Sequence, residues 1–405
     1  MFWKRRIYLD TAAGVGGNSS SPHEEGRRAK KMLEDARTTI ARLVEVQSDD
    51  VIFTSGATEA NALAILGHVR ALRASGMNTM HVLHLSSAHA SVVENVALLA
   101  REGVITEALP IRDYRIDTKA LAMILRDETV LVTMDAVCGE TGVVWNTREV
   151  ARVLEKFRSG ESKNASARAA RPIQHAFLNS PSRIFLHVDA SQAPLTEKIT
   201  RAHFGADMLT LDGSKVGATR GIGALIAHRT IPLEPLYRGG GQERGLRPGS
   251  EAQELAKRFA ACLRQAALNR ETFTTSAKYN RSQLIERIKI AIPNVLVNEG
   301  SAQTQNILNI SLLGRDTDYI VALLDEAGFA VSTRSACETD SEEGSRAVLA
   351  LTGDPERALS TLRISWGPDI RESELIRFAR TLKEAVAFSS EGGSASGGID
   401  IDSYR

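Results

Sequence analysis

The feature that most constrains the fold is a repeated order of short apolar segment, small-residue turn and amphipathic helix. Residues 49–72, 78–100 and 128–154 each follow this order. Further apolar segments that favour strands are RIFLHVDASQ, ADMLTLDGSK and IGALIAHR. Alternating strands and helices, with strands that are apolar almost throughout, indicate a mostly parallel sheet covered by helices. The pattern therefore predicts an α/β fold.

The end of the chain predicts a second, smaller α/β domain. A long helical pattern starts near residue 251, and ILNISLLG, DYIVALLDEAG and TLRISWG then alternate strand and helix. The length of 405 residues also favours more than one domain. We predict a large domain over residues 12–255 and a small domain formed by residues 1–11 and 256–388.

Two segments differ in composition from the rest of the chain. Residues 157–183 are basic and rich in Ser and Ala, and we expect a mobile surface insertion, with docking of a partner as the alternative. Residues 389–405 are rich in Gly and Ser, which predicts a disordered tail.

Charge and cysteine content limit the class of protein. With 50 Lys and Arg against 49 Asp and Glu, the chain has no charge excess that favours direct binding to nucleic acid or to a membrane. Three cysteines without a CxxC spacing indicate a reducing cytoplasm rather than a disulfide framework. No apolar run is long enough for a signal peptide or a membrane span, and we predict no metal site.

Two charged residues follow predicted strands, where open α/β sheets bind their ligands. Lys215 lies in a small-residue turn, and a lysine that loses its charge can form a Schiff base, although most lysines only solubilise the surface. Asp189 ends an apolar strand, and a buried carboxylate needs a cationic partner. The protonated ring nitrogen of pyridoxal phosphate (PLP) is such a partner. The alternative for Asp189 is a helix N-cap.

Strand-to-helix turns supply two further candidates. Gly56, Ala57 and Thr58 lie in such a turn, where backbone N–H groups and the helix dipole attract an anion such as a phosphate. His89 lies in the next such turn, where an imidazole can stack on a planar cofactor and carry protons. Alone, the first is a common glycine turn and the second a histidine that faces water.

Nine motifs occur in the order found in PLP-dependent cysteine desulfurases: YLDTAAG, GNSSSPH, SGATEAN, SAH, HVDASQ, DGSK, GGGQERGLRPGS, RSAC and LRISWG. Over about residues 7–385 the chain resembles that family, which belongs to the class V aminotransferases of PLP fold type I. The resemblance implies a homodimer with a large PLP domain and a small domain. It also implies L-cysteine as substrate, with L-alanine and an enzyme persulfide as products.

The resemblance assigns the substrate-handling residues. Cys337, in the polar segment VSTRSACETDSEEG, matches the nucleophilic thiol of a flexible loop. An exposed thiol can reach the substrate and then carry sulfur to an acceptor, which a packed thiol cannot. Arg363 matches the arginine that binds the substrate carboxylate. The spacing between these residues resembles the branch that passes sulfur to scaffold or carrier proteins.

The resemblance also assigns the residues around the cofactor ring. Lys215 bonds to the cofactor and moves the Cα proton, and Asp189 pairs with the ring nitrogen. Gln192 donates to the ring hydroxyl oxygen, and His89 stacks on the ring and relays protons.

The phosphate of the cofactor has its own set of matched residues. By resemblance the turn Gly56–Thr58 binds it together with Ser214. Ser250 stands where the family has a threonine that reaches the phosphate bound by the neighbouring subunit, which implies a dimer.

The chain departs from the family pattern at several positions. Gly139 replaces an asparagine that helps to hold the substrate carboxylate, and Cys138 precedes it, either as a small packing residue or close enough to the cofactor to matter chemically. Asp212 lies in the segment expected at the phosphate, which a carboxylate would repel unless it points away.

Three functions are compatible with these motifs. The first is a cysteine desulfurase that supplies persulfide sulfur for iron–sulfur clusters or tRNA thiolation. The second is a related PLP lyase, such as a selenocysteine lyase or a cysteine-sulfinate desulfinase, for which Cys337 is dispensable. The third is a degenerate scaffold that binds a sulfur-transfer partner, motivated by Gly139 and the basic insertion. Five retained residues favour an enzyme over a scaffold: Lys215, Asp189, His89, Cys337 and Arg363.

Overall fold

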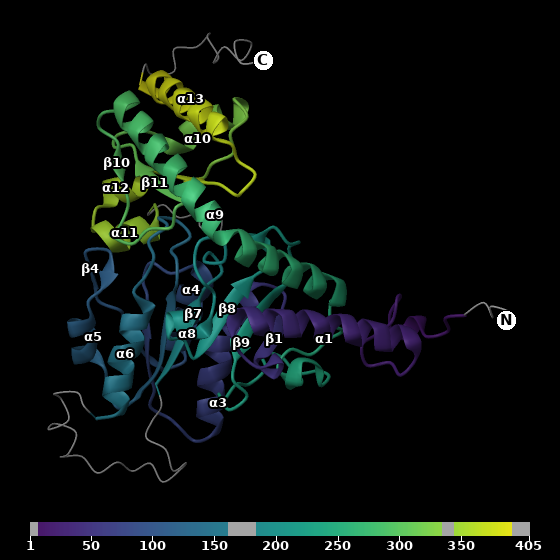
Figure 1. Cartoon of the computed structure of the whole chain (residues 1–405). Helices are drawn as coiled ribbons and strands as arrows, with labels where there is room; N and C mark the ends of the chain where they lie inside the picture. Colours follow the sequence, from purple (N-terminus) through teal and green to yellow (C-terminus); the bar gives the residue numbers. More distant parts are fainter. Residues whose placement is uncertain (1–6, 161–183, 334–343, 391–405) are drawn as a thin grey trace.

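A computed structural model describes residues 7–160, 184–333 and 344–390 (Figure 1). Cys337, most of the predicted insertion at 157–183 and nearly all of the predicted tail at 389–405 lie outside these residues. The described chain forms two main β-sheets of different size with helices packed around them, besides one two-stranded hairpin, and the long helix α9 (Gln253–Ala291) runs from one main sheet to the other (Figure 1).

The large sheet has seven strands in the order β1-β9-β8-β7-β6-β2-β3. Strands β3, β2, β6, β7 and β8 are parallel to one another, whereas β9 is antiparallel to both β8 and β1. The predicted α/β fold with a mostly parallel sheet is confirmed. The strands are β1 (Val51–Thr54), β2 (His81–His84), β3 (Ile105–Ala108), β6 (Thr129–Asp135), β7 (Phe185–Asp189), β8 (Met208–Asp212) and β9 (Gly223–Ala227).

Helices cover both faces of this sheet, which explains why its central strands are apolar without alternation. Every residue of β6, β7 and β9 is buried, while β3 at the edge is partly exposed. The helices are α1 (Glu24–Val44), α2 (Ala57–Ala62), α3 (His68–Ala74), α4 (Ala90–Arg101), α5 (Thr118–Ile124), α6 (Thr147–Arg158) and α8 (Arg201–Phe204). A π-helical turn, Leu63–Gly67, joins α2 to α3 without a break.

The small sheet is antiparallel, with the order β10 (Leu296–Val297), β11 (Ile307–Ser311) and β12 (Thr361–Ser365). The helices after β11 are α10 (Thr317–Glu326), α11 (Arg346–Thr352), α12 (Pro355–Leu359) and α13 (Glu372–Ser390). A short hairpin of β4 (Ile111–Arg112) and β5 (Arg115–Ile116) projects from the large part toward α11 (Figure 1).

Helix α9 contributes side chains to two separate hydrophobic cores. Phe259 and Leu263 belong to the core of the large sheet, and Leu284 and Ile288 belong to the core of the small sheet. The predicted division into residues 12–255 and 256–388 would cut near the start of this helix, and that boundary stays a prediction.

The carboxyl ends of three neighbouring parallel strands each carry an aspartate. Asp135 ends β6, Asp189 ends β7 and Asp212 ends β8. In the register of the sheet, Asp135 and Asp189 are directly paired. Because carboxyl ends of parallel strands meet at one edge, the fold gathers these groups where α/β proteins bind ligands.

None of the helices in the described part of the chain is both long and apolar enough to cross a lipid bilayer.

A close backbone approach fixes the turn after β1. A Cβ atom at Gly223, the first residue of β9, would lie 2.7 Å from backbone atoms of Gly56. Gly223→Ala is therefore expected to lower the free energy of unfolding by about 1–3 kcal/mol, because the backbone must shift. Gly241→Ala is the matched control, since a Cβ there meets no atom within 4 Å. Urea denaturation measures both; equal stability of the two variants would contradict the prediction.

Candidate active site

Asp189 is a buried carboxylate held by neutral donors. Its Oδ2 accepts a hydrogen bond from Asn61 Nδ2 at 2.7 Å, and its Oδ1 accepts from the backbone N–H of Ser191 at 2.9 Å and from the Ser191 hydroxyl. Ser191 lies in the turn directly after β7, and the next helix, α8, begins only at Arg201, so the alternative of a helix N-cap for Asp189 is wrong. In the described residues no Lys or Arg forms an ion pair with Asp189.

A chain of hydrogen bonds connects Asp189 to His89. Asn61 Nδ2 also donates to Ser91 Oγ at 2.8 Å, and Ser91 Oγ lies 2.8 Å from His89 Nδ1. The backbone N–H of Ser91 donates to the same Nδ1 at 3.2 Å, so this nitrogen is an acceptor. When His89 is neutral, its proton is therefore on Nε2. The imidazole thus caps the start of α4 and presents a donor at Nε2.

Sequence reasoning gave no role to Asn61 or Ser91. Asn61 lies within the quoted SGATEAN motif, one turn into α2, and Ser91 lies two residues after His89. The only signal was that Asn61 lies in a motif and Ser91 lies close to one. Their contacts could not be predicted, because strand order decides whether residues 128 positions apart, such as Asn61 and Asp189, meet.

Asp135 is a second buried carboxyl group beside Asp189. Burial raises the pKa of Asp135 well above its usual range, and the neighbouring Asp189 carboxylate raises it further, while the backbone N–H of His89 donates to it and acts in the opposite direction. Asp135 Oδ1 has no hydrogen-bond partner among the described residues. The surroundings therefore favour the neutral form of Asp135, whose strand end pairs with that of Asp189 in the sheet.

Lys215 lies on the next loop along the sheet edge. It is exposed in the short 3-10 turn η4 (Ser214–Val216), which follows β8. Ser214 precedes it, and both the backbone N–H and the hydroxyl of Ser214 donate to Asp212 Oδ1, at 2.7 and 2.6 Å. Asp189 and Lys215 thus come from strands β7 and β8, which are hydrogen-bonded neighbours in the sheet.

The predicted phosphate turn also contacts Asp212. Gly56 precedes α2, and the backbone N–H of Ala57 donates to Asp212 Oδ2 at 3.0 Å. Thr58 is exposed in the first turn of the helix. The structure thus brings Gly56–Thr58, Ser214 and Asp212 together, and the Asp212 carboxylate points toward the turn rather than away from it.

Arg363 reaches this edge from the small sheet. It lies on β12, and its Nη1 donates to the carbonyl oxygen of Gly139 at 3.3 Å. A Cβ atom at Gly139 would lie 3.2 Å from Gln192 Nε2, so the Gln192 amide stands beside the position where the family has an asparagine side chain. Gln192, Gly139 and Arg363 therefore form one cluster.

Both described ends of the segment that contains Cys337 are anchored near this cluster. Ser332 pairs with Arg363, whose backbone N–H donates to the Ser332 carbonyl at 2.7 Å. On the other side, Ser345 Oγ donates to Glu140 Oε2 at 2.5 Å, next to Gly139.

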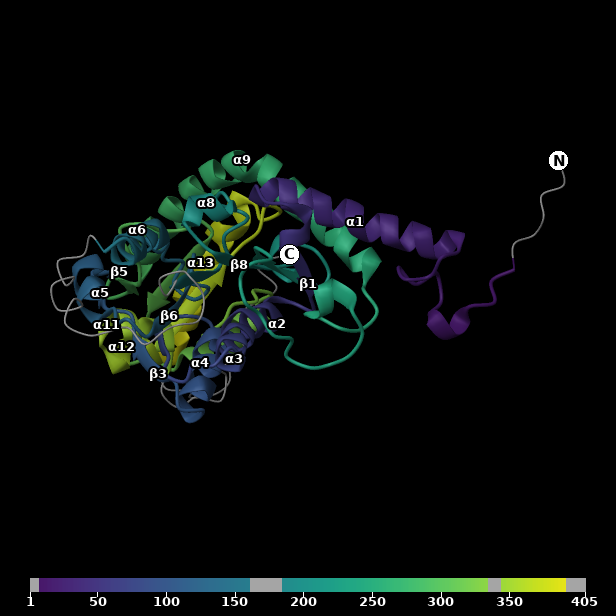
Figure 2. The ribbon, with the colours of Figure 1, turned by 90° about the horizontal axis from the view of Figure 1, so that it is seen from below.

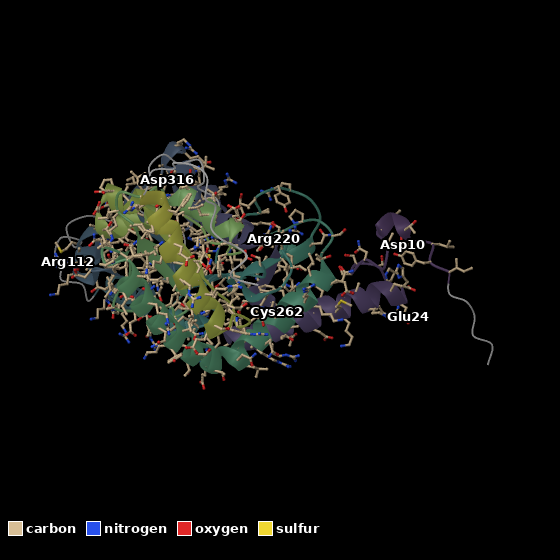
Figure 3. The ribbon with its side chains drawn as sticks, turned by 90° about the horizontal axis from the view of Figure 1, so that it is seen from above. Asp10, Glu24, Arg112, Arg220, Cys262 and Asp316 are labelled. Atoms are coloured by element: carbon tan, nitrogen blue, oxygen red, sulfur yellow. The ribbon has the colours of Figure 1, made fainter. Side chains whose placement is uncertain are left out.

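Ser250 and the other cysteines are placed differently. Ser250 is exposed on the loop before α9, and no hydrogen bond within the described chain joins it to the other candidates. Cys138 is fully buried; burial, with smaller contributions from Glu140 and Asp135, raises its thiol pKa to about 11. It is protonated at neutral pH, as expected for a packing residue. Cys262 is half-buried on α9 (Figure 3).

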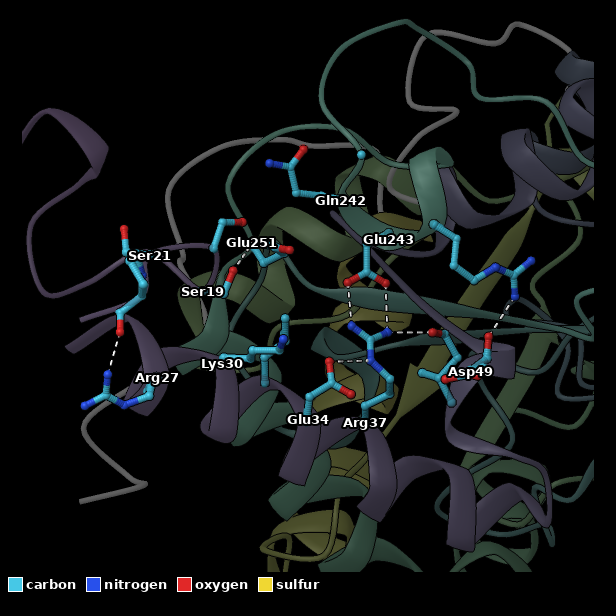
Figure 4. Close-up of a pocket in the computed structure, with 16 residues that line it drawn as sticks. Ser19, Ser21, Arg27, Lys30, Glu34, Arg37, Asp49, Gln242, Glu243 and Glu251 are labelled. Carbon is cyan, nitrogen blue, oxygen red and sulfur yellow. Dashed lines mark hydrogen bonds and ion pairs between the residues drawn. The ribbon is translucent and has the colours of Figure 1, made fainter. Parts of the chain in front are cut away.

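A cavity of about 750 Å³ lies between α1 and residues 241–251, next to Ser250 and apart from the other candidates (Figure 4). Its wall includes a buried ion pair between Arg37 Nη2 and Glu243 Oε1 at 2.7 Å, and Glu243 also accepts from the backbone N–H of Phe53. None of the candidate catalytic residues that the structure describes lines it. Because Arg37 and Glu243 in its wall are already paired with each other and the candidate residues lie elsewhere, we place the chemistry at the sheet edge instead.

The fold and this edge define an α/β protein in which a lysine and a buried carboxylate follow neighbouring strands of the large sheet and an arginine approaches from the small sheet. The family model of class-V aminotransferases matches residues 6–159 and 171–378, and the chain belongs to this family. The predicted resemblance to the class V group is confirmed.

Two similar proteins are named cysteine desulfurases. The chain is 28% identical to cysteine desulfurase IscS 1 of Archaeoglobus fulgidus, over 91% of this chain and 90% of that protein. It is 30% identical to the mitosomal cysteine desulfurase of Trachipleistophora hominis, over 92% of this chain and 80% of that protein. Among solved structures, DndA from Streptomyces lividans is 30% identical with a TM-score of 0.68, over 88% of this chain and 94% of that one.

A NifS-like protein has the same fold at lower identity. It is 20% identical, with a TM-score of 0.79, and the match covers 93% of both chains. This likeness supports the fold alone.

Neutral Asp135 should be detectable in the pH dependence of stability. As pH rises above about 4, the unfolded chain ionises this group while the folded chain does not, so wild type loses stability until its raised pKa is passed. Asp135→Asn cannot ionise. The free energy of unfolding of the variant relative to wild type is therefore expected to rise between pH 4 and 7, measured by urea denaturation.

The control is Asp113→Asn, which removes an exposed carboxylate from the turn between β4 and β5. Its stability relative to wild type should not follow pH in this way. A constant difference for Asp135→Asn across the same range would show that Asp135 is ionised in the folded protein.

Proposed function

We propose that this protein is a PLP-dependent cysteine desulfurase that converts L-cysteine to L-alanine and transfers the sulfur to its own Cys337. The observation that carries the proposal is the convergence of Lys215, Asp189 and Arg363 on one sheet edge. The cysteine desulfurase names of similar proteins, over most of their length, support the same activity.

The residues at the edge fit the ring of PLP. Asp189 is buried, yet within the described chain its hydrogen-bond donors are the neutral groups of Asn61 and Ser191. A buried carboxylate is stabilised by a cation, which a protonated ring nitrogen would provide. When bound, PLP supplies an electron sink for the substrate's Cα. Lys215 is the amine that would bond to it and then move the Cα proton.

Other residues of the chain position the substrate and carry protons. Arg363 offers a planar set of donors that suits the carboxylate of L-cysteine, and its Nη1 contact with Gly139 orients the guanidinium. Gln192 stands beside the same glycine and would donate to the ring hydroxyl oxygen. By resemblance His89 would stack on the face of the PLP ring, and its neutral imidazole carries a proton on Nε2 because Nδ1 is an acceptor.

Cys337 would accept the sulfur. In the proposed reaction its sulfur bonds to the sulfur of the substrate while the substrate's carbon–sulfur bond breaks. L-cysteine and an enzyme thiol thereby become L-alanine and an enzyme persulfide, with no external oxidant. The anchoring of Ser332 at Arg363 and of Ser345 at Glu140 supports this role, because both flanks of the segment start beside the substrate site.

The destination of the sulfur is proposed from the resemblance. A scaffold or carrier protein of iron–sulfur cluster assembly or tRNA thiolation would receive it from Cys337. The similar proteins include mitochondrial and mitosomal forms, and a cytoplasmic location for this chain stays a prediction from its cysteine content.

A homodimer is the proposed assembly. The N-terminal end of α1 and residues 7–23 before it project away from the body as an arm (Figures 2 and 3). Leu9 and Val15 on this arm are each 90% exposed, an unfavourable state for apolar side chains that a partner subunit would relieve. Ser250 lies on the loop beside the cavity of Figure 4. The resemblance implies that, in a dimer, this residue reaches the phosphate bound by the other subunit.

Removal of the two reactive groups tests the activity. Lys215→Ala is expected to lose the visible absorbance of bound PLP and to lower turnover by at least about 100-fold. Cys337→Ala should keep the absorbance and lose sulfide release. Purified protein is incubated with L-cysteine and a reductant, and sulfide and alanine are measured.

Matched controls are Lys198→Ala, an exposed lysine paired with Glu45, and Cys262→Ala on α9. Both should retain wild-type rates. Native rates of sulfide release in Cys337→Ala would favour the alternative PLP lyases, and a wild-type protein that takes up no PLP would favour the non-catalytic scaffold.

The exposed apolar side chains of the arm predict that the protein is a dimer. Leu9→Glu/Val15→Glu is expected to shift the protein from dimer to monomer, because the charges oppose burial of the arm. Met123→Glu is the control, since Met123 is 70% exposed on α5, at the opposite end of the molecule (Figure 1). Sedimentation velocity measures both, and a monomeric wild type would rule out the proposed assembly.

A further inference from the structure

We infer that Asp212 is a built-in competitor for the phosphate group of the cofactor, so that it weakens PLP binding and lowers the preference for PLP over unphosphorylated pyridoxal. The inference rests on the proposed function, because it concerns the same cofactor site. It arises from the departure at DGSK, where an acidic side chain occupies a segment expected to face a phosphate.

The first support is the identity of the groups that Asp212 occupies. Its Oδ2 accepts from the backbone N–H of Ala57, 155 residues away in sequence, and its Oδ1 accepts from the N–H and hydroxyl of Ser214. These are donors that the resemblance assigns to the phosphate. Each N–H has a single hydrogen, so a phosphate oxygen gains it only when the carboxylate gives it up.

The second support is the surroundings of Asp212. Oδ2 lies 3.5 Å from the position of a Cβ on Gly56, which places the carboxylate against the turn itself. The backbone behind it is confined: a Cβ at Gly213 would come within 2.7 Å of Ile222, and the Gly213 N–H donates to the Ile222 carbonyl. The side chain can rotate, but its Cα remains at the phosphate end of the site.

The third support is the sign of the charges. A phosphate dianion and a carboxylate repel each other at close range, and in the described chain no Lys or Arg pairs with Asp212 to cancel its charge. The dipole of the helix that starts at Ala57 favours one anion there. Asp212 already fills this role, so the phosphate must displace it.

The ring end of the site is independent of this conflict. Asp189 is held by Asn61 and Ser191, and neither of these contacts Asp212. Pyridoxal, which has the same ring and aldehyde but no phosphate, reports on the ring end alone. A comparison of the two ligands therefore separates competition at the phosphate from damage to the rest of the site.

The experiment measures equilibrium binding of PLP and of pyridoxal to cofactor-free protein, by absorbance titration and equilibrium dialysis. The variants are Asp212→Asn, which keeps the shape without the charge, and Asp212→Ser, which also shortens the side chain. Circular dichroism verifies that each variant is folded. Asp113→Asn is the control for loss of one carboxylate elsewhere.

We expect both Asp212 variants to bind PLP about 10- to 100-fold more tightly than wild type, since charge-assisted hydrogen bonds no longer have to be broken first. Pyridoxal affinity should stay the same, and Asp113→Asn should match wild type for both ligands. Variants that bind PLP no more tightly, or that gain equally for pyridoxal, would overturn the inference while leaving the proposed activity intact. Absence of PLP binding in every chain would overturn both.

Discussion

The contact between Asn61 and Asp189 is the interaction on which the rest of the site depends. It joins the helix after β1 to the end of β7, and through Ser91 it extends to His89 at the start of α4. One amide therefore joins the carboxylate to the hydrogen bonds that orient the imidazole. The donors to Asp189 described above are neutral groups, and a cationic ligand would complement this carboxylate.

The same sheet edge is unusually acidic, and the structure manages this in two ways. Burial and the neighbouring Asp189 raise the pKa of Asp135 and so favour its neutral form. Asp212 stays at the edge and takes hydrogen bonds from Ala57 and Ser214. Asp135, Asp189 and Asp212, which end three neighbouring strands, thus set how much negative charge this edge offers to a ligand.

The fold could be predicted from sequence because its determinants are local. Buried parallel strands are apolar throughout, and each of the three strand–turn–helix stretches contributes a strand to the large sheet. Asp189 and Lys215 could be proposed from their positions after such strands. The link through Asn61 and Ser91 could not, because it depends on which strands become neighbours. The direction of Asp212 was also left open, since a side-chain rotamer decides it. The contact of Arg363 with Gly139 joins two sheets, and no local pattern encodes it.

Helix α9 has a mechanical consequence. It runs without interruption for 39 residues, about 58 Å, and its side chains are built into both hydrophobic cores. A hinge inside it would break backbone hydrogen bonds, so the helix is a stiff connection between the two cores. The placement of Arg363 relative to the large sheet therefore depends in part on how tightly this one helix is seated in each core.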